Sequence, residues 1–130
     1  MEKLTVQTKK QKQVVDITDA VNTLIAKHKV NEGTCMLFLT HTTAALTTAD
    51  LDPGTDLDLL DAFEEIVPKL RYRHPHDPSH VSDHILSSLI GTSLTIPIED
   101  GRLTLGTWQR VVLLEFSGPR DRELVVSFRK

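Results

Sequence analysis

The chain is poor in the residues that mark several common classes of protein. It contains a single cysteine, Cys35, which excludes an internal disulfide and lies where a small buried hydrophobic residue is expected. Aromatic residues make up 5% of the sequence, and the formal net charge is −3. Together these values argue against a general nucleic-acid-binding protein.

Long apolar segments are also missing. No run approaches the roughly 20 apolar residues that span a bilayer, and the first residues lack the charged-then-apolar layout of a signal peptide. We therefore expect a cytoplasmic protein, and 130 residues predict a single domain, 1–130. The sequence contains no P-loop, nucleophile-elbow or dinucleotide-binding glycine motif.

What the sequence does contain is organised around residues 33–46. The apolar run Cys35–Leu39 is too short for a helix, which predicts a strand covered on both faces. Alternation along this strand places His41 on the same face as Cys35. The strand therefore carries an imidazole out of the core, followed at once by the hydroxyls of Thr42 and Thr43.

The remaining pattern predicts three helices among eight strands. The helices are expected over Asp19–Lys29 with Thr18 as N-cap, after Thr55 as N-cap to about Ile66, and from Ser79 or His80 to just before Gly91. Strands are not separated by helices in strict alternation, so we predict an α+β fold with a mostly antiparallel sheet. The expected strands are Lys3–Thr8, Gln13–Ile17, Cys35–Leu39, Ala44–Thr48, Ser93–Ile98, Arg102–Leu105, Gln109–Phe116 and Leu124–Phe128.

Histidine is locally enriched, because four of the six histidines fall within eleven positions: His74, His76, His80 and His84. His80 and His84 are four residues apart on a predicted helix, so they share a face. With His41 and His74 they make four candidates for a three-histidine site, which would leave a zinc-like ion one open coordination position. The alternative is a solvated histidine-rich loop, and the spacing matches no short metal motif.

Glu115 interrupts an otherwise apolar strand. A carboxylate there is either exposed on one face or buried with a partner, because isolated burial of charge is costly. If its face lines a cleft together with Gln109, Glu115 is a candidate general acid or base. The alternative role is that of an ordinary salt-bridge residue.

Two further features could contribute to a site. Gly106 precedes Thr107 and the only tryptophan, Trp108. A glycine at this place in a sheet indicates a bulge or a close approach to a ligand, and the alternative is a kinked strand with Trp108 in the core or an interface. Arg120 and Arg122 flank a turn and could bind phosphate oxygens, or could be isolated surface arginines.

Several ordered segments occur together along nearly the whole chain: His41-Thr42-Thr43-Ala44-Ala45-Leu46-Thr47, Tyr72 with His74, His84 to Gly91, Ser93 to Ile98, Gly101 to Gln109, and Glu115. This combination resembles the YjbQ family, small proteins linked to a secondary thiamine-phosphate synthase activity. The resemblance implies an α+β half-barrel that assembles as a homotrimer, with a histidine-bound divalent metal, expected to be zinc, in a cleft.

The resemblance also implies roles for individual residues. His41, His74 and His84 fall on the family's recurrent histidines and are the implied metal ligands, whereas His80 falls where the family more often has Asn or Asp. The implied reaction joins a pyrimidine diphosphate to a thiazole phosphate and releases pyrophosphate. The residues given roles in it are Thr42, Thr43, Gln109 and Arg120 as hydrogen-bond donors and Glu115 as a proton acceptor.

Three functions are therefore compatible with the sequence. The first is a metal-dependent enzyme acting on a phosphorylated small molecule. The second is a non-catalytic protein that binds a metal or an anionic metabolite. In the third the metal is purely structural, and protein ligands fill all of its coordination positions.

Overall fold

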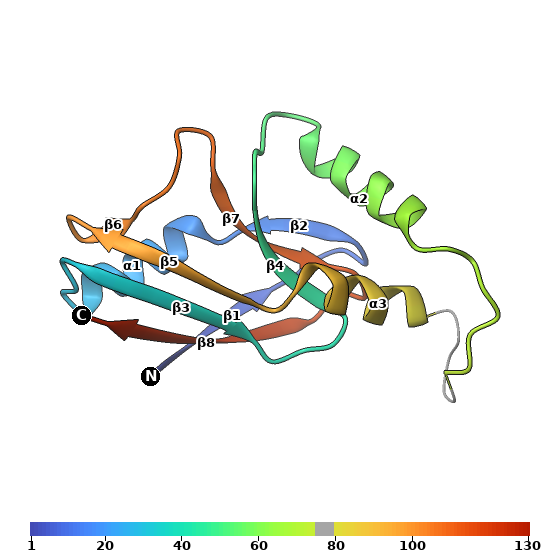
Figure 1. Ribbon diagram of the computed structural model, residues 1–130, viewed down its shortest axis with the longest axis horizontal. Helices are drawn as coiled ribbons and strands as arrows, with labels where there is room; N and C mark the ends of the chain where they lie inside the picture. Colours follow the sequence, from blue (N-terminus) through green and yellow to red (C-terminus); the bar gives the residue numbers. More distant parts are fainter. Residues whose placement is uncertain (75–79) are drawn as a thin grey trace.

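The computed structural model describes residues 1–74 and 80–130, which form one α+β domain (Figure 1). No helix among these residues has the length and apolar character needed to cross a membrane. The elements, in chain order, are β1 (Glu2–Gln7), β2 (Gln13–Asp16), α1 (Thr18–Lys27), β3 (Gly33–Leu39), β4 (Ala44–Ala49), α2 (Thr55–Ile66), α3 (Val81–Ile90), β5 (Ser93–Glu99), β6 (Arg102–Leu103), β7 (Arg110–Glu115) and β8 (Asp121–Arg129).

The strands form two antiparallel sheets that together make a half-barrel. One sheet has five strands in the order β1-β8-β3-β5-β6, and the other has three in the order β2-β7-β4. Figure 1 shows α2 and α3 beside the three-stranded sheet, with α1 near the far end of the five-stranded sheet. The predicted fold class, with its three helices and antiparallel pairing, is confirmed.

The core has two parts, and β7 lies between them. Val111 and Leu113 belong to the larger cluster, which also contains residues of α1, β3 and β8. Val112 and Leu114 alternate with them and belong to a smaller cluster with residues of α2 and α3. Because both faces of β7 are covered, its unbroken apolar run is the pattern expected of a central strand.

The prediction that β3 is covered on both faces is wrong for the single chain. Cys35 and Leu37 are fully buried on the core face, and burial raises the pKa of the Cys35 thiol to about 11. Phe38 points the other way and is 43% exposed. The five-stranded sheet packs its core on one face only, so the second apolar face of β3 lies at the surface.

The helices begin differently from the predictions. Ile17 is the N-cap of α1 and Thr18 its first residue, whose N–H donates to the carboxylate of Asp16 at 3.0 Å. Thr55 is likewise the first residue of α2, and Gly54 precedes it with a left-handed φ of 93°. His80 occupies the N-cap position of α3. The predicted start at Ser79, and His76, lie outside the described residues.

Each predicted strand is present, although the ends differ by a few residues. The largest difference is in β8, which begins at Asp121 and not at Leu124 because it continues pairing with β1 as far as Gln7. This extension matters for the site, since it brings Arg122 into the sheet.

Two leucine-to-alanine substitutions, one in the buried core and one at the surface, test the described packing of the core. Leu37→Ala empties fully buried volume and is expected to lower the free energy of unfolding by about 2–5 kcal/mol. Leu57→Ala, in α2, removes a side chain that is 59% exposed and is expected to change it by about 0.5 kcal/mol or less. Urea titration followed by circular dichroism gives both values, and equal losses would contradict the described core.

Candidate functional site

A cleft of about 360 Å³ lies where β3 ends, where β4 and β8 begin, and where the chain enters α3. The side chains around it are imidazoles, hydroxyls and guanidiniums. Among the described residues that line it, none carries a carboxylate. The lining residues are Thr40, His41, Thr42, Thr43, His80, His84, Arg120 and Arg122.

A buried ion pair forms the floor of this region. The carboxylate of Glu115, at the end of β7, accepts from Nε of Arg122 at 2.7 Å and from its Nη2 in a second, very short bond. The two side chains are 0% and 2% exposed. Two parallel bonds between a guanidinium and a carboxylate fix both groups in one plane and orientation.

Other hydrogen bonds complete the environment of Glu115. The Thr8 hydroxyl donates to Oε2 at 2.8 Å, and the Ser117 N–H donates to Oε1 at 3.0 Å. Burial alone would raise the pKa of the Glu115 carboxyl, but the bonds from Arg122, Ser117 and Thr8 outweigh it and lower the pKa below the ordinary 4.5. Glu115 is therefore a carboxylate at neutral pH, with both oxygens already accepting hydrogen bonds.

Arg122 also orients Thr43, the first of the predicted donors. Its Nη2 donates to the Thr43 hydroxyl oxygen at 2.8 Å and to the Thr43 carbonyl at 3.2 Å. A hydroxyl that accepts a bond in this way keeps its own O–H available to donate. Thr43 lines the cleft. Glu115 therefore influences the cleft indirectly, because it positions Arg122 and Arg122 positions the Thr43 hydroxyl.

Arg120 reaches the cleft from the loop before β8. Its Nε donates to the Ser117 carbonyl at 2.6 Å, which holds the side chain while leaving other guanidinium N–H groups available. The loop passes very close to Glu115 at Gly118. A Cβ added at Gly118 would lie 2.4 Å from the Lys10 carbonyl oxygen and 2.8 Å from Cγ of Glu115, so this position requires glycine.

His84 is oriented in the manner of a metal-ligating histidine. Its Nδ1 lies 3.0 Å from the Thr42 carbonyl, a geometry in which Nδ1–H donates and Nε2 keeps its lone pair. The ring of His74 stacks on His84 with centroids 5.2 Å apart and an interplanar angle of 12°. The loop before α3 and the helix itself thus bring two of the three predicted ligands together.

His41 also lines the cleft, but its Nε2 accepts a hydrogen bond from the Glu123 N–H at 2.9 Å. Burial, followed by the nearby Arg122 guanidinium, lowers the pKa of His41 below the ordinary 6.5, so the ring is neutral at neutral pH. A neutral imidazole has one lone pair, and here the Glu123 N–H occupies it. His41 would have to release that bond to ligate a metal.

His74 and His84 thus lie side by side with stacked rings, and His41 could join them around one ion only after its ring moves. Within residues 1–74 and 80–130, no group of three or more His, Cys, Asp or Glu side chains is assembled around a common point. The three-histidine site remains a prediction.

Gln109 does not lie near the histidine cleft in the same chain. Its side chain accepts from the Gly106 N–H at 3.0 Å and donates to the Thr48 hydroxyl at 3.1 Å, at the opposite end of β7 from Glu115. The structure thus gathers Thr42, Thr43, Arg120 and Glu115 with the histidines and separates Gln109 from them.

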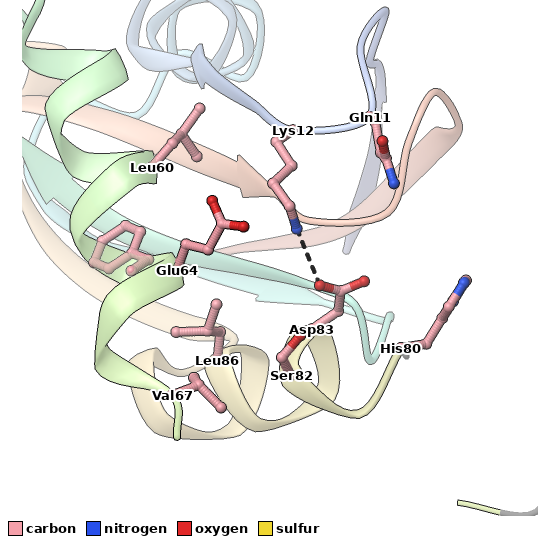
Figure 2. A pocket seen from close by; sticks show the side chains of 10 residues that line it. Gln11, Lys12, Leu60, Glu64, Val67, His80, Ser82, Asp83 and Leu86 are labelled. Carbon is pink, nitrogen blue, oxygen red and sulfur yellow. Dashed lines mark hydrogen bonds and ion pairs between the residues drawn. The ribbon is translucent and has the colours of Figure 1, made fainter. Parts of the chain in front are cut away.

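A second cavity of about 260 Å³ adjoins the cleft, because His80 lines both (Figure 2). Figure 2 shows Lys12 reaching down from the loop before β2 toward Asp83 of α3. Lys12 Nζ donates to Asp83 at 3.1 Å and to the Phe116 carbonyl at 3.1 Å. This contact fixes the first turn of α3, and therefore His84, against the sheet.

Sequence reasoning missed several residues that support the site. Asp83 carried a weak signal, as an acidic residue in the first turn of a helix. Lys12, Thr8 and Ser117 carried none, because their partners lie far away in sequence or in a turn of irregular conformation.

Comparisons with known proteins agree with this architecture. Solved structures of a conserved hypothetical protein from Thermus thermophilus, TT1486, and of an uncharacterised conserved YjbQ/UPF0047-family protein from Clostridium acetobutylicum superpose with TM-scores of 0.87 and 0.89. They share 37% and 35% identity, each alignment covering 99% of this chain and 100% of the other. The class is thus a small α+β half-barrel protein with a polar cleft at the open end of its sheets.

The family follows from the sequence comparisons. The model of the family described as UPF0047 protein YjbQ-like matches residues 2–130. A UPF0047 protein of Archaeoglobus fulgidus is 37% identical over 95% of this chain and 96% of its own length. The chain belongs to the YjbQ-like UPF0047 family, as the sequence motifs indicated.

The buried pair gives a test of what holds the cleft together. Glu115→Gln leaves Arg122 buried without its counter-charge and is expected to destabilise the protein by about 3–5 kcal/mol at pH 7. Because the folded pKa of Glu115 is lowered, its contribution is fully present above pH 4.5 and is lost as pH falls through the folded value. Urea titrations from pH 7 to pH 3 should therefore show a flatter acid dependence for the variant than for the wild type.

Replacing both Glu115 and Arg122 measures the interaction between the two charges separately from the other contacts of each side chain. Glu115→Gln combined with Arg122→Met should cost less than the sum of the two single changes, since no unpaired charge stays buried. Strict additivity, or parallel acid profiles of wild type and Glu115→Gln, would contradict the assignment.

Proposed function

We propose that the cleft binds a divalent metal and the phosphate groups of a small molecule, and that the protein acts as an enzyme on that molecule. The observation that carries the proposal is that an oriented histidine, a fixed threonine hydroxyl and an available arginine share one cleft with no carboxylate in its described lining. Such a set suits an anionic ligand, because carboxylates would repel it.

His74 and His84 would hold the metal, with His41 as the third ligand of the predicted set. When bound, zinc would supply Lewis-acid stabilisation of charge on a phosphate oxygen. Thr42, Thr43 and Arg120 donate hydrogen bonds to the remaining oxygens. Glu115 holds the Arg122 guanidinium in place, and its predicted part in proton transfer stays secondary to that role.

The named candidate reaction is thiamine-phosphate synthesis, in which a pyrimidine diphosphate and a thiazole phosphate join and pyrophosphate leaves. Hydrogen-bond donors that are already held in position favour such chemistry, because they stabilise the negative charge that develops on the leaving diphosphate. Cytoplasmic location and homotrimeric assembly belong to the same proposal. The alternative is a non-catalytic trimeric protein that binds a metal or an anionic metabolite, which the same cleft would also suit.

Metal content tests the histidine assignment. His84→Ala removes the best-oriented donor and should lower zinc retained per chain after dialysis by at least about tenfold, as expected for loss of a ligand. His28→Ala is the matched control, because His28 pairs with Glu2 on another part of the surface. Mass spectrometry of the purified proteins gives the ratio, and equal zinc in the two variants would remove the metal from the proposal.

Anion binding tests the arginine. Arg120→Gln should weaken binding of inorganic pyrophosphate by about tenfold or more, the loss expected for one hydrogen bond between charged groups. Arg102→Gln, at an exposed position of β6, should bind like the wild type. Calorimetric titration gives both affinities, and equal affinities for the two variants would exclude Arg120.

A turnover assay distinguishes the enzymatic function from the non-catalytic binding function. With both thiamine precursors, thiamine phosphate should form and a chelator should abolish its formation. Pyrophosphate binding without any turnover would favour the non-catalytic alternative.

A further inference from the structure

A hollow beneath α2 has no role in the proposed phosphate site. It is the second cavity, of about 260 Å³, which lies between α2, the start of α3 and the loop before β2 (Figure 2). An amphipathic helix normally buries its apolar face in the core. No residue of α2 is buried, however, and Leu60 and Phe63 are only partly covered because the cavity lies beside them. The helix thus borders an open space next to the candidate site.

One wall of the second cavity is apolar. It consists of Leu60, Phe63, Val67 and Leu86. The ring of Phe63 meets that of Phe116 edge to face, with centroids 6.3 Å apart and an interplanar angle of 88°, which holds it in one orientation. A flat apolar group can therefore pack against this wall without first ordering it.

The charged groups of the lining favour a ligand that donates hydrogen bonds. Lys12 Nζ is already bonded to Asp83 at 3.1 Å and to the Phe116 carbonyl at 3.1 Å, so the charges of Lys12 and Asp83 offset each other. Glu64 has no hydrogen bond or ion pair with any other described residue. Figure 2 shows its carboxylate pointing from α2 into the space beside Lys12. A carboxylate without a partner attracts a cation or an N–H donor and repels an anion.

The size of the cavity restricts the ligand to a small one. A water molecule occupies about 30 Å³ in the liquid, so a cavity of about 260 Å³ corresponds to about nine non-hydrogen atoms. This volume holds one aromatic ring with a short substituent. It is too small for a nucleobase together with its sugar.

The first turn of α3 separates the second cavity from the histidine cleft. Asp83 lines the cavity and His84, the next residue, lines the cleft, because successive residues of a helix point about 100° apart. His80, at the start of this turn, lines both. A ligand that consists of a ring and a phosphate could therefore occupy both hollows across this single turn.

We propose that the second cavity binds the ring of a small ligand that carries an amine or amidine group. The ring packs on Phe63 and Leu86, and its N–H groups donate to the Glu64 carboxylate, with two parallel bonds when the group is an amidine. Gln11 and Ser82, which also line the cavity, are available to the remaining polar atoms of the ligand. The placing of this ring as the organic part of a phosphorylated molecule rests on the proposed function, whereas the ring site itself does not.

Three probes of equal shape and different charge test the ring site. Benzamidine, benzamide and benzoate match the cavity in size and are cationic, neutral and anionic, respectively, at pH 7. Ligand-observed NMR titration of the wild type should give affinities in that order, with benzamidine about tenfold tighter than benzamide, as expected for charged hydrogen bonds to a carboxylate. Benzamidine should bind at least as well in saturating inorganic pyrophosphate, because the two ligands occupy separate hollows.

Variants of α2 assign the binding to the cavity. Glu64→Gln should remove the preference for benzamidine over benzamide, whereas Glu65→Gln, at an exposed position outside the lining, should keep it. Leu60→Trp should fill the cavity and abolish benzamidine binding. Leu57→Trp, at a position that is 59% exposed, is the matched control and should bind like the wild type. Circular dichroism checks that each variant is folded.

The proposal would be overturned by equal affinities for the three probes, by a benzamidine preference that survives Glu64→Gln, by unchanged benzamidine binding in Leu60→Trp, or by competition between benzamidine and pyrophosphate. None of these readouts requires metal or turnover. A protein that binds benzamidine as described but does not bind pyrophosphate would keep the ring site and lose the proposed function. A protein that binds pyrophosphate but not benzamidine would lose the ring site alone.

Discussion

The ion pair between Glu115 and Arg122 is the constraint on which the open end of the half-barrel depends. Glu115 ends β7 in the three-stranded sheet, and Arg122 lies in β8 of the five-stranded sheet, so the pair joins the two sheets. In a region of low dielectric, separating the charges would leave each unsolvated, at a cost of several kcal/mol. The two sheets therefore cannot shift relative to each other at this end without a large penalty. The cleft owes its shape to this pair, because its Thr43 and Arg120 walls are attached to the same two strands.

The pair also explains how a buried carboxylate influences a surface site that it does not touch. Arg122 uses the same nitrogen to bind Glu115 and Thr43, so the charge of Glu115 sets the direction of the Thr43 hydroxyl. On the other side of the cleft, the contact between Lys12 and Asp83 fixes α3 and with it His84. The lining of the cleft is thus held from both sides by charged pairs that lie behind it. Such support from outside the site is the usual means by which a protein keeps ligand-binding groups in position before a ligand arrives.

The sequence predicted the fold class and every strand because periodicity and turn residues are local signals, and β3 and β7 carry strong ones. It could not say which apolar strand is covered on both faces, since Phe38 is exposed in β3 whereas the residues from Val111 to Glu115 in β7 are all buried. For Glu115 the rule against isolated buried charge predicted a partner, but only the antiparallel return of β8 identifies Arg122. The pairing of Lys12 with Asp83 spans 71 positions and leaves no local trace. Gln109 was grouped with Glu115 because alternation along one strand places both on the same face, but the length of β7 separates them.

His41 has a second role besides lining the cleft. The pairing of β3 with β8 stops at Leu39 and Leu124, and the ring of His41 satisfies the next backbone N–H, that of Glu123. The imidazole thus serves as one additional rung of the ladder. An ion that binds this ring must first displace the Glu123 amide, so the ion and the end of β8 compete for one nitrogen. Loading would then register as faster amide hydrogen exchange at a single backbone position, which makes the end of the sheet a reporter of what occupies the cleft.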